Sequence, residues 1–131
     1  MQNNLQTNTV LDLTQFTMSK HGIQFKILHP SEEPKAQLGD IVTVDYTGYL
    51  LKGTHEIGQK FDSSLDRHQP FSFKLGYGQV IEGWELSVSD MRIGEERIVI
   101  LPSHLAYGEH AISIIPAHAS LIFVIKLLAI E

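Results

Sequence analysis

Residues 79–95, QVIEGWELSVSDMRIGE, contain the clearest helical pattern in the chain. Apolar side chains recur in this stretch at helical spacing, namely at Ile81, Trp84, Val88 and Met91. Gly94 follows them and supplies a stop signal. The stretch therefore predicts one short helix, from about residue 81 to residue 92.

Outside this helix the apolar pattern changes to the period of two that is typical of strands. The alternation begins at Ile23, and β-branched and aromatic residues continue it in four later segments, at 41–51, 71–75, 96–101 and 121–130. Both faces of the last segment are apolar, which predicts that something covers its second face. Because several strands accompany a single helix without regular alternation, the sequence predicts an α+β fold in which a mostly antiparallel sheet wraps the helix.

Composition limits the classes of protein to consider. The chain has 131 residues, of which 43% are hydrophobic, so it has the size and make-up of one globular domain. Its net charge of −5 and scattered basic residues exclude a nucleic-acid partner, because such binding requires lysine and arginine to displace counterions from phosphates. No cysteine occurs, which excludes disulfides and thiolate chemistry.

The N-terminal residues differ in composition from the rest of the chain. Residues 1–9 are almost all Gln, Asn and Thr, so we expect residues 1–20 to form an arm that is flexible or docked on the surface of a domain at 21–131. No signal peptide or apolar run of membrane-spanning length is present. We therefore expect a soluble, cytoplasmic protein without a membrane partner, or a periplasmic or exported one if a signal peptide has been removed.

Two patterns that suggest cofactor or metal binding fail on spacing. Gly76, Gly78 and Gly83 precede or open the helix, but Ile81 occupies the position where a dinucleotide-binding fingerprint requires its third glycine. The seven histidines form none of the short spacings that are typical of metal ligands. We expect no metal and no cofactor.

The segment KFDSSLDRHQPF at 60–71 places Ser63, Ser64, Asp66 and His68 close together in sequence, which raises the hypothesis of a nucleophilic triad. Triads, however, draw their residues from separate segments that meet in space. Serine and aspartate in one loop more often form hydrogen bonds to nearby backbone groups. A turn is the favoured interpretation, and a small hydrolase is the weaker alternative.

Five segments occur in an order that carries more information than any one of them: VDYTGYL at 44–50, KFDSSLDRHQPFSFKLG at 60–76, QVIEGWELSVSDMRIGE at 79–95, AYG at 106–108 and IIPAHASLIFVIKLL at 114–128. Together they resemble the successive signatures of a single-domain member of the FKBP-type peptidyl-prolyl cis-trans isomerases, the family that binds the macrolide rapamycin. The resemblance extends from about residue 22 to residue 131. It implies a twisted half-barrel sheet around a short helix, with a shallow apolar pocket between them.

The resemblance also implies the residues of that pocket. Four would act in catalysis: Asp62, Tyr107, Phe123 and Tyr46. Nine would contact substrate or macrolide: Phe61, Arg67, Phe71, Gln79, Val80, Ile81, Trp84, Ile114 and Ile115. Trp84 would form the floor, and Arg67 would hold Asp62, the one carboxylate at the rim.

The activity implied is the acceleration of rotation about X-Pro bonds, assisting protein folding, with proline-containing peptides and unfolded chains as partners. The alternative is a non-catalytic adaptor on the same fold that binds proline-containing peptides or macrolides. We expect a monomer, with a dimer through the arm or the last strand as a second option.

The chain departs from the family pattern at three places. The turn at 51–60 is longer than usual, the flap at 109–113 is slightly shorter, and Gln79 replaces a common acidic residue.

Overall fold

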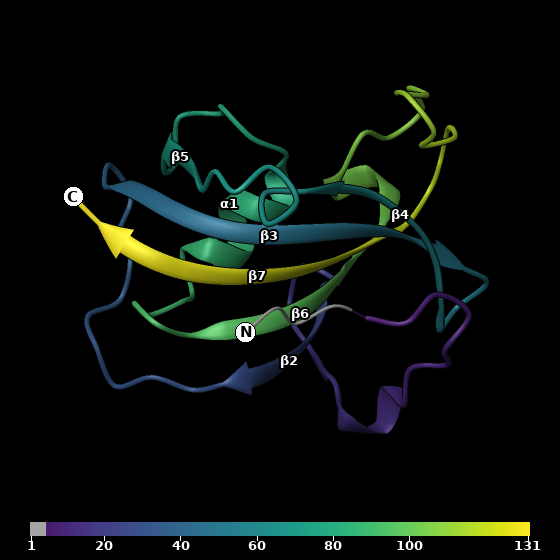
Figure 1. Ribbon diagram of the computed structural model, residues 1–131, viewed down its shortest axis with the longest axis horizontal. Coiled ribbons are helices and arrows are strands. Elements are labelled where there is room, and N and C mark those ends of the chain that lie inside the picture. Colours follow the sequence, from purple (N-terminus) through teal and green to yellow (C-terminus); the bar gives the residue numbers. More distant parts are fainter. Residues whose placement is uncertain (1–4) are drawn as a thin grey trace.

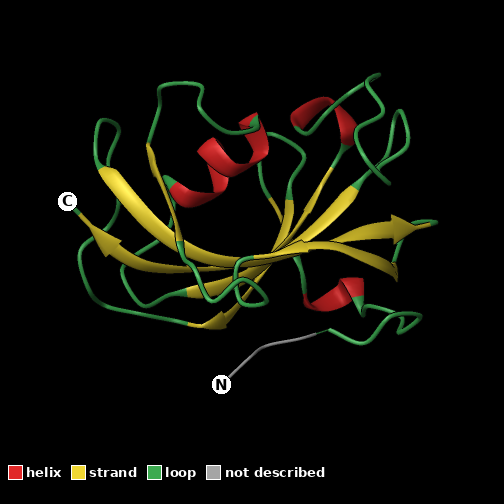
Figure 2. Cartoon of the chain, turned by 45° about the horizontal axis from the view of Figure 1, so that its top comes forward, coloured by secondary structure: helices red, strands yellow, loops and turns green. Residues whose placement is uncertain are grey.

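The structure, a computed structural model, describes residues 5–131. These residues form ten elements: η1 (Leu13–Gln15), β1 (Thr17–Met18), β2 (Gln24–His29), β3 (Ile41–Lys52), β4 (Glu56–Ser63), β5 (Phe71–Lys74), α1 (Glu82–Val88), β6 (Glu96–Leu101), η2 (Ser103–Leu105) and β7 (Leu121–Ile130). The strands form one antiparallel sheet in the order β1-β2-β6-β7-β3-β4, with β5 also paired to β3. The sheet is twisted and α1 lies against one of its faces (Figures 1 and 2), which confirms the predicted α+β fold.

Helix α1 is shorter than predicted: it ends at Val88, whereas the apolar pattern indicated an end near residue 92. After this residue the backbone hydrogen bonds shorten to three-residue spacing: the N–H of Asp90 donates to Ser87, and that of Met91 donates to Val88. Met91 is nevertheless fully buried, so the apolar pattern continues through a turn that is no longer α-helical. Gly94, with φ of 88°, lies in the turn before β6 and not at the helix end.

Strand β4 was not predicted from the sequence. The segment at 51–60 was expected to be a long turn, but only residues 53–55 connect β3 to β4, and the extra residues lengthen the two strands of a hairpin. The pairing of the hairpin shifts register between Gly48 and Tyr49 and again between Tyr49 and Leu51. Such irregularities interrupt the period of two on which strand prediction depends.

The main core lies between α1 and the face of the sheet that it covers. Alternate residues of the central strands point into this core, and they include Val42, Val44, Val99, Leu101, Leu121, Phe123, Ile125 and Leu127. Gly83 lets the helix approach closely, since a Cβ added there would lie 2.6 Å from Leu101 Cδ1. This close approach sets the position of Trp84, the next residue in the helix.

The second face of the sheet carries a smaller apolar cluster, formed by Tyr49, Ile57, Ile98, Ile100, Ile122 and Val124. These residues alternate along their strands with those of the main core. Half-buried residues cover the cluster, and most of them come from the N-terminal segment: Leu5, Leu11, Leu13, Phe16, Leu28 and Leu51. The expectation that something covers the second face of the last strand is confirmed.

The N-terminal segment is held on this face by backbone hydrogen bonds to β4 and the preceding turn. The N–H of Asn8 donates to the carbonyl of Ile57 at 2.6 Å, and the N–H of Ile57 donates to Thr9 at 2.9 Å. Leu11 donates to His55 at 2.7 Å. Figure 2 shows this segment, with its helical turn η1, on the face of the sheet opposite α1. The described part of the predicted arm thus contacts the sheet, and residues 1–4 lie outside the described part of the chain.

Strand β7 lies inside the sheet, with β6 paired along one edge and β3 along the other. Residues 121–126 of β7 are therefore paired on both sides within the sheet. Among the described residues, no helix is both long enough and apolar enough to cross a membrane.

Candidate active site

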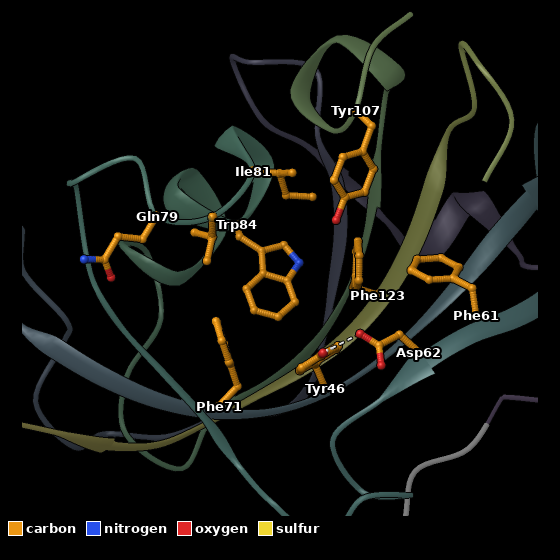
Figure 3. A pocket seen from close by; sticks show the side chains of 10 residues that line it. Tyr46, Phe61, Asp62, Phe71, Gln79, Ile81, Trp84, Tyr107 and Phe123 are labelled. Atoms are coloured by element: carbon orange, nitrogen blue, oxygen red, sulfur yellow. Dashed lines mark hydrogen bonds between the residues drawn. The ribbon is translucent and has the colours of Figure 1, made fainter. Parts of the chain in front are cut away.

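A cavity of about 400 Å³ opens between α1 and the sheet. Side chains from four strands, from α1 and from the segments before α1 and after η2 line it: Tyr46, Phe61, Asp62, Phe71, Gln79, Val80, Ile81, Trp84, Tyr107 and Phe123. Figure 3 shows Tyr46, Phe61, Asp62, Phe71, Ile81, Tyr107 and Phe123 arranged around a common space beside Trp84. All ten lining residues are among the site residues that the resemblance implied. The cavity thus brings together side chains that lie as far apart in the sequence as Tyr46 and Phe123.

Trp84 forms the floor of the cavity and is only 5% exposed. Its ring lies edge-on to Tyr46 and Phe123, at centroid distances of 4.7 and 5.3 Å, and contacts Phe71 at 6.0 Å. Edge-to-face ring pairs of this kind stabilise a fold by about 0.5–1.5 kcal/mol beyond the burial of their area. The aromatic walls are therefore fixed by mutual packing before any ligand enters.

Gly48 is a residue of the site that the sequence analysis missed. A Cβ added at Gly48 would lie 2.6 Å from Phe61 Cζ and 2.7 Å from Phe123 Cε1, both of which belong to cavity walls. The two rings are also 5.6 Å apart and nearly perpendicular. Only glycine leaves room for this arrangement, and a glycine inside a strand is the sequence signal that could have identified the close approach.

Asp62, Tyr46 and Arg67 form a hydrogen-bonded triangle at the rim. The hydroxyl of Tyr46 donates to Asp62 Oδ2 at 2.5 Å (Figure 3), Arg67 Nη1 donates to Asp62 Oδ1, and Arg67 Nη2 donates to the Tyr46 oxygen at 2.9 Å. Burial alone would raise the pKa of Asp62, but the hydrogen bonds from Tyr46 and Arg67 outweigh it and lower that pKa below its ordinary value. Asp62 is therefore ionised at neutral pH.

The same triangle keeps the phenol of Tyr46 protonated. Burial raises the pKa of Tyr46, and its hydrogen bond to Asp62 raises that pKa further. Arg67 lies outside the cavity lining but holds both other members, with its guanidinium 5.8 Å from the centre of the Tyr46 ring. The predicted contact between Arg67 and Asp62 is present.

The hydrogen-bond donors at the cavity that have no partner within the described chain include the hydroxyl of Tyr107, which points into the cavity in Figure 3, the backbone N–H of Ile81 at the start of α1 and the buried indole N–H of Trp84. Burial, with a smaller contribution from the charge of Asp62, raises the pKa of Tyr107, so its hydroxyl stays protonated and can donate. The amide of Gln79 is turned away from the centre of the cavity and accepts the Lys74 N–H at 2.9 Å.

Besides Arg67, two predicted binding residues do not line the cavity. Ile114 is 43% exposed in the flap, and Ile115 is buried in the main core beside the site. A bridge between Ile112 and Ile115 closes this part of the flap, and Ser113 within it has a φ of 54°. This tight turn leaves Ile114 exposed and Ile115 buried.

The hydrolase hypothesis is contradicted by the hydrogen bonds of the two serines. Ser63 is bonded to Thr47, and Ser64 is bonded to Asp45 and to the backbone of Tyr46. Both serines are buried, whereas His68 is exposed and bonded to neither. The loop has no activated nucleophile.

Metal ligation has no support in the described part of the chain, where no group of three or more His, Cys, Asp or Glu side chains is close enough to hold an ion. The cavity lining contains no lysine, histidine, serine or threonine. Its polar groups suit hydrogen bonding to a ligand more than bond cleavage.

The fold and the site together define a class of protein: a sheet wrapped around a short helix, with a cavity between them that is lined by aromatic side chains and a few hydrogen-bond donors. Residues 32–128 match the family of FKBP-type peptidyl-prolyl cis-trans isomerases, and the chain belongs to that family.

Individual relatives agree with this assignment. The chain is 49% identical over 96 residues to FK506-binding protein 2 of Debaryomyces hansenii, an alignment that covers 73% of this chain and 67% of the relative. It is 42% identical over 116 residues to FK506-binding protein 2B of Rhizopus delemar, covering 88% and 54% of the two chains. The crystal structure of FkpA from Escherichia coli superposes with a TM-score of 0.78 at 28% identity, covering 89% of this chain and 52% of that one. The chain thus spans between half and two thirds of the length of these relatives.

Proposed function

We propose that the cavity accelerates cis-trans rotation about X-Pro bonds in peptides and unfolded chains, and thereby assists folding. The uncatalysed rotation takes tens to hundreds of seconds because it breaks amide resonance, at a barrier of about 18–20 kcal/mol. The reaction requires no proton transfer and no covalent intermediate. A site for it must only bind the twisted amide more tightly than either planar isomer.

The observation that carries the proposal is the aromatic cavity with Trp84 as its floor. Its size and largely apolar lining suit a proline ring packed on the indole. In the twisted state the carbonyl carries less charge separation than in the planar amide. An apolar surrounding therefore disfavours the twisted state less than the planar one, which is the condition for acceleration.

Two of the donors without partners would fix the peptide while the bond rotates. The Ile81 N–H lies at the start of α1 and the Tyr107 hydroxyl points into the cavity, so both can donate to carbonyls that flank the proline. Asp62 would act on the rotating carbonyl through its charge, or through the orientation of Tyr46.

We further propose that a macrolide of the rapamycin type occupies the same cavity, since a bulky apolar ring with a few carbonyl acceptors has the same requirements as the proline ring. The names of the Debaryomyces hansenii and Rhizopus delemar relatives, which describe proteins that bind FK506, support this assignment by similarity.

Exchange NMR on a short X-Pro peptide, with and without rapamycin, tests both proposals. We expect the chain to accelerate exchange and the drug to abolish the acceleration. Drug binding without acceleration would instead assign the chain to the binding modules, and the absence of both would refute the cavity as the functional site.

A further inference from the structure

The pairing of β3 with β4 ends at Thr47 and Ser63, and the contact between the next two residues, Tyr46 and Ser64, deviates from the usual antiparallel pattern. Two residues opposite each other in an antiparallel hydrogen-bonded pair exchange both backbone bonds. The Ser64 N–H does donate to the Tyr46 carbonyl, at 3.0 Å. The Tyr46 N–H, however, donates to the side-chain oxygen of Ser64 at 2.9 Å, so a hydroxyl replaces the expected carbonyl.

This replacement releases the Ser64 carbonyl for another bond. The carbonyl accepts the N–H of Gln69 at 3.2 Å, which closes the loop 64–69 upon its first residue. Arg67 lies inside this loop, and its partners lie on the two paired strands, Asp62 on β4, which the loop leaves, and Tyr46 on β3. The loop that carries Arg67 is thus attached through Ser64 to the backbone of Tyr46.

The hydroxyl of Ser64 is fixed in orientation as well as position. It donates to Asp45 Oδ1 at 2.8 Å while it accepts from Tyr46, and Ser64 is completely buried. An alanine at this position could neither accept from Tyr46 nor donate to Asp45. The Tyr46 N–H would then either lose its hydrogen-bond partner or donate to the backbone carbonyl of Ser64. In the second case the Ser64 carbonyl would be drawn away from the Gln69 N–H, which closes the loop.

We propose that Ser64 is a positioning residue of the isomerase site: its hydroxyl lets β4 leave the sheet and closes the loop 64–69, so that Arg67 reaches Asp62 and Tyr46. This role rests on the proposed isomerase function, but its geometry does not depend on turnover. Ser64 does not touch the cavity and acts only through the triangle.

The test is a titration of the Asp62 side-chain carboxyl, followed by its ¹³C chemical shift, in the full chain and in Ser64→Ala. If Ser64 positions Arg67, the pKa of Asp62 rises in the variant toward that of an ordinary aspartate, because the hydrogen bonds that lower it are weakened. We also expect kcat/KM to fall roughly tenfold, within the range that small misplacements produce. Asp45→Ala is the second variant, for the case that Ser64→Ala does not fold. It removes only the acceptor of the Ser64 hydroxyl and changes a residue that is only half-buried. We expect it to raise the pKa of Asp62 as well, but by less than Ser64→Ala does.

Thr47→Val is the matched control. It removes a buried hydroxyl bond of the same strand pair, between Thr47 and Ser63 at 2.9 Å, and leaves in place both the bonds of Ser64 and the bond from the Leu65 N–H to the Ser63 hydroxyl. We expect Thr47→Val to lose stability while the pKa of Asp62 and kcat/KM stay at their wild-type values. An unchanged Asp62 pKa in the folded Ser64 and Asp45 variants overturns the proposal, and so does an equal change in Thr47→Val. An inactive wild-type chain would refute the isomerase function alone, because the titration still decides the role of Ser64.

Discussion

Replacing Gly48 by alanine is expected to damage the cavity without altering any group that contacts substrate. The added Cβ would lie 2.6 Å from Phe61 Cζ, 2.9 Å from Phe61 Cε1 and 2.7 Å from Phe123 Cε1. Gly48 does not have a left-handed backbone conformation, so alanine meets no backbone strain there. The whole effect must therefore come from displacement of the two rings.

The size of this displacement follows from ordinary contact distances. Carbon atoms pack at about 3.5–4.0 Å, so each ring must retreat by about 1 Å. Such overpacking in a core costs about 1–3 kcal/mol of stability. Because Phe61 and Phe123 form adjoining walls, a shift of this size is expected to lower kcat/KM by about 10- to 100-fold.

The measurements are urea unfolding for stability and the X-Pro exchange assay for activity, with Gly58→Ala as the control. A Cβ at Gly58 would lie 2.7 Å from the carbonyl oxygen of Leu50, so this variant also overpacks the β3–β4 hairpin, but outside the cavity. We expect both variants to lose stability and only Gly48→Ala to lose activity. Wild-type kcat/KM in a folded Gly48→Ala would refute the reasoning that these two rings shape the reacting site.

Three further predictions concern separate parts of the molecule. Trp84→Leu keeps an apolar floor but removes the ring contacts, so we expect a loss of macrolide and peptide affinity of at least about tenfold. Isothermal titration calorimetry measures this affinity. Asp62→Ala should lower kcat/KM only partly. The pKa of Asp62 is lowered in the folded state, so the stability that its carboxylate contributes is present at neutral pH and is lost as the pH falls through this folded-state pKa. Urea unfolding should therefore show the stabilities of wild type and variant converging below about pH 4. Leu11→Asp places a charge against the second apolar face and should cost about 1–3 kcal/mol without changing kcat/KM, and a loss of activity in the folded variant would contradict the separation of the two faces.

The sequence predicted those parts of the fold that have regular periodicity. The alternation of β6 and β7 divides cleanly between the main core and the second face, and both strands have the predicted bounds. Strand β4 was missed because two register shifts interrupt its pattern. Helix α1 was predicted too long because Met91 keeps the apolar spacing in a turn where the hydrogen bonds have already changed.

The site was predicted through motif order and not through residue chemistry. Periodicity could not decide whether Trp84 belonged to a core or to a pocket, since its ring packs in the main core and also lines the cavity. Contacts that depend on three-dimensional approach were beyond sequence reasoning, such as the space that Gly48 leaves for two rings and the link between Ser64 and Tyr46. The separation of Ile114 from Ile115 likewise depends on the turn geometry of one short flap.

The arrangement around Asp62 explains how an apolar cavity tolerates an ionised group. Each carboxylate oxygen already accepts a hydrogen bond, Oδ2 from Tyr46 and Oδ1 from Arg67, and the positive charge of Arg67 balances the negative one. Both charged side chains are partly exposed, so solvent screens the pair and its net contribution to stability is small. A carboxylate held in this way is a fixed charge with little freedom to turn and accept a proton. This agrees with a reaction in which a bond rotates and no proton moves, and it assigns the triangle to orientation and electrostatics.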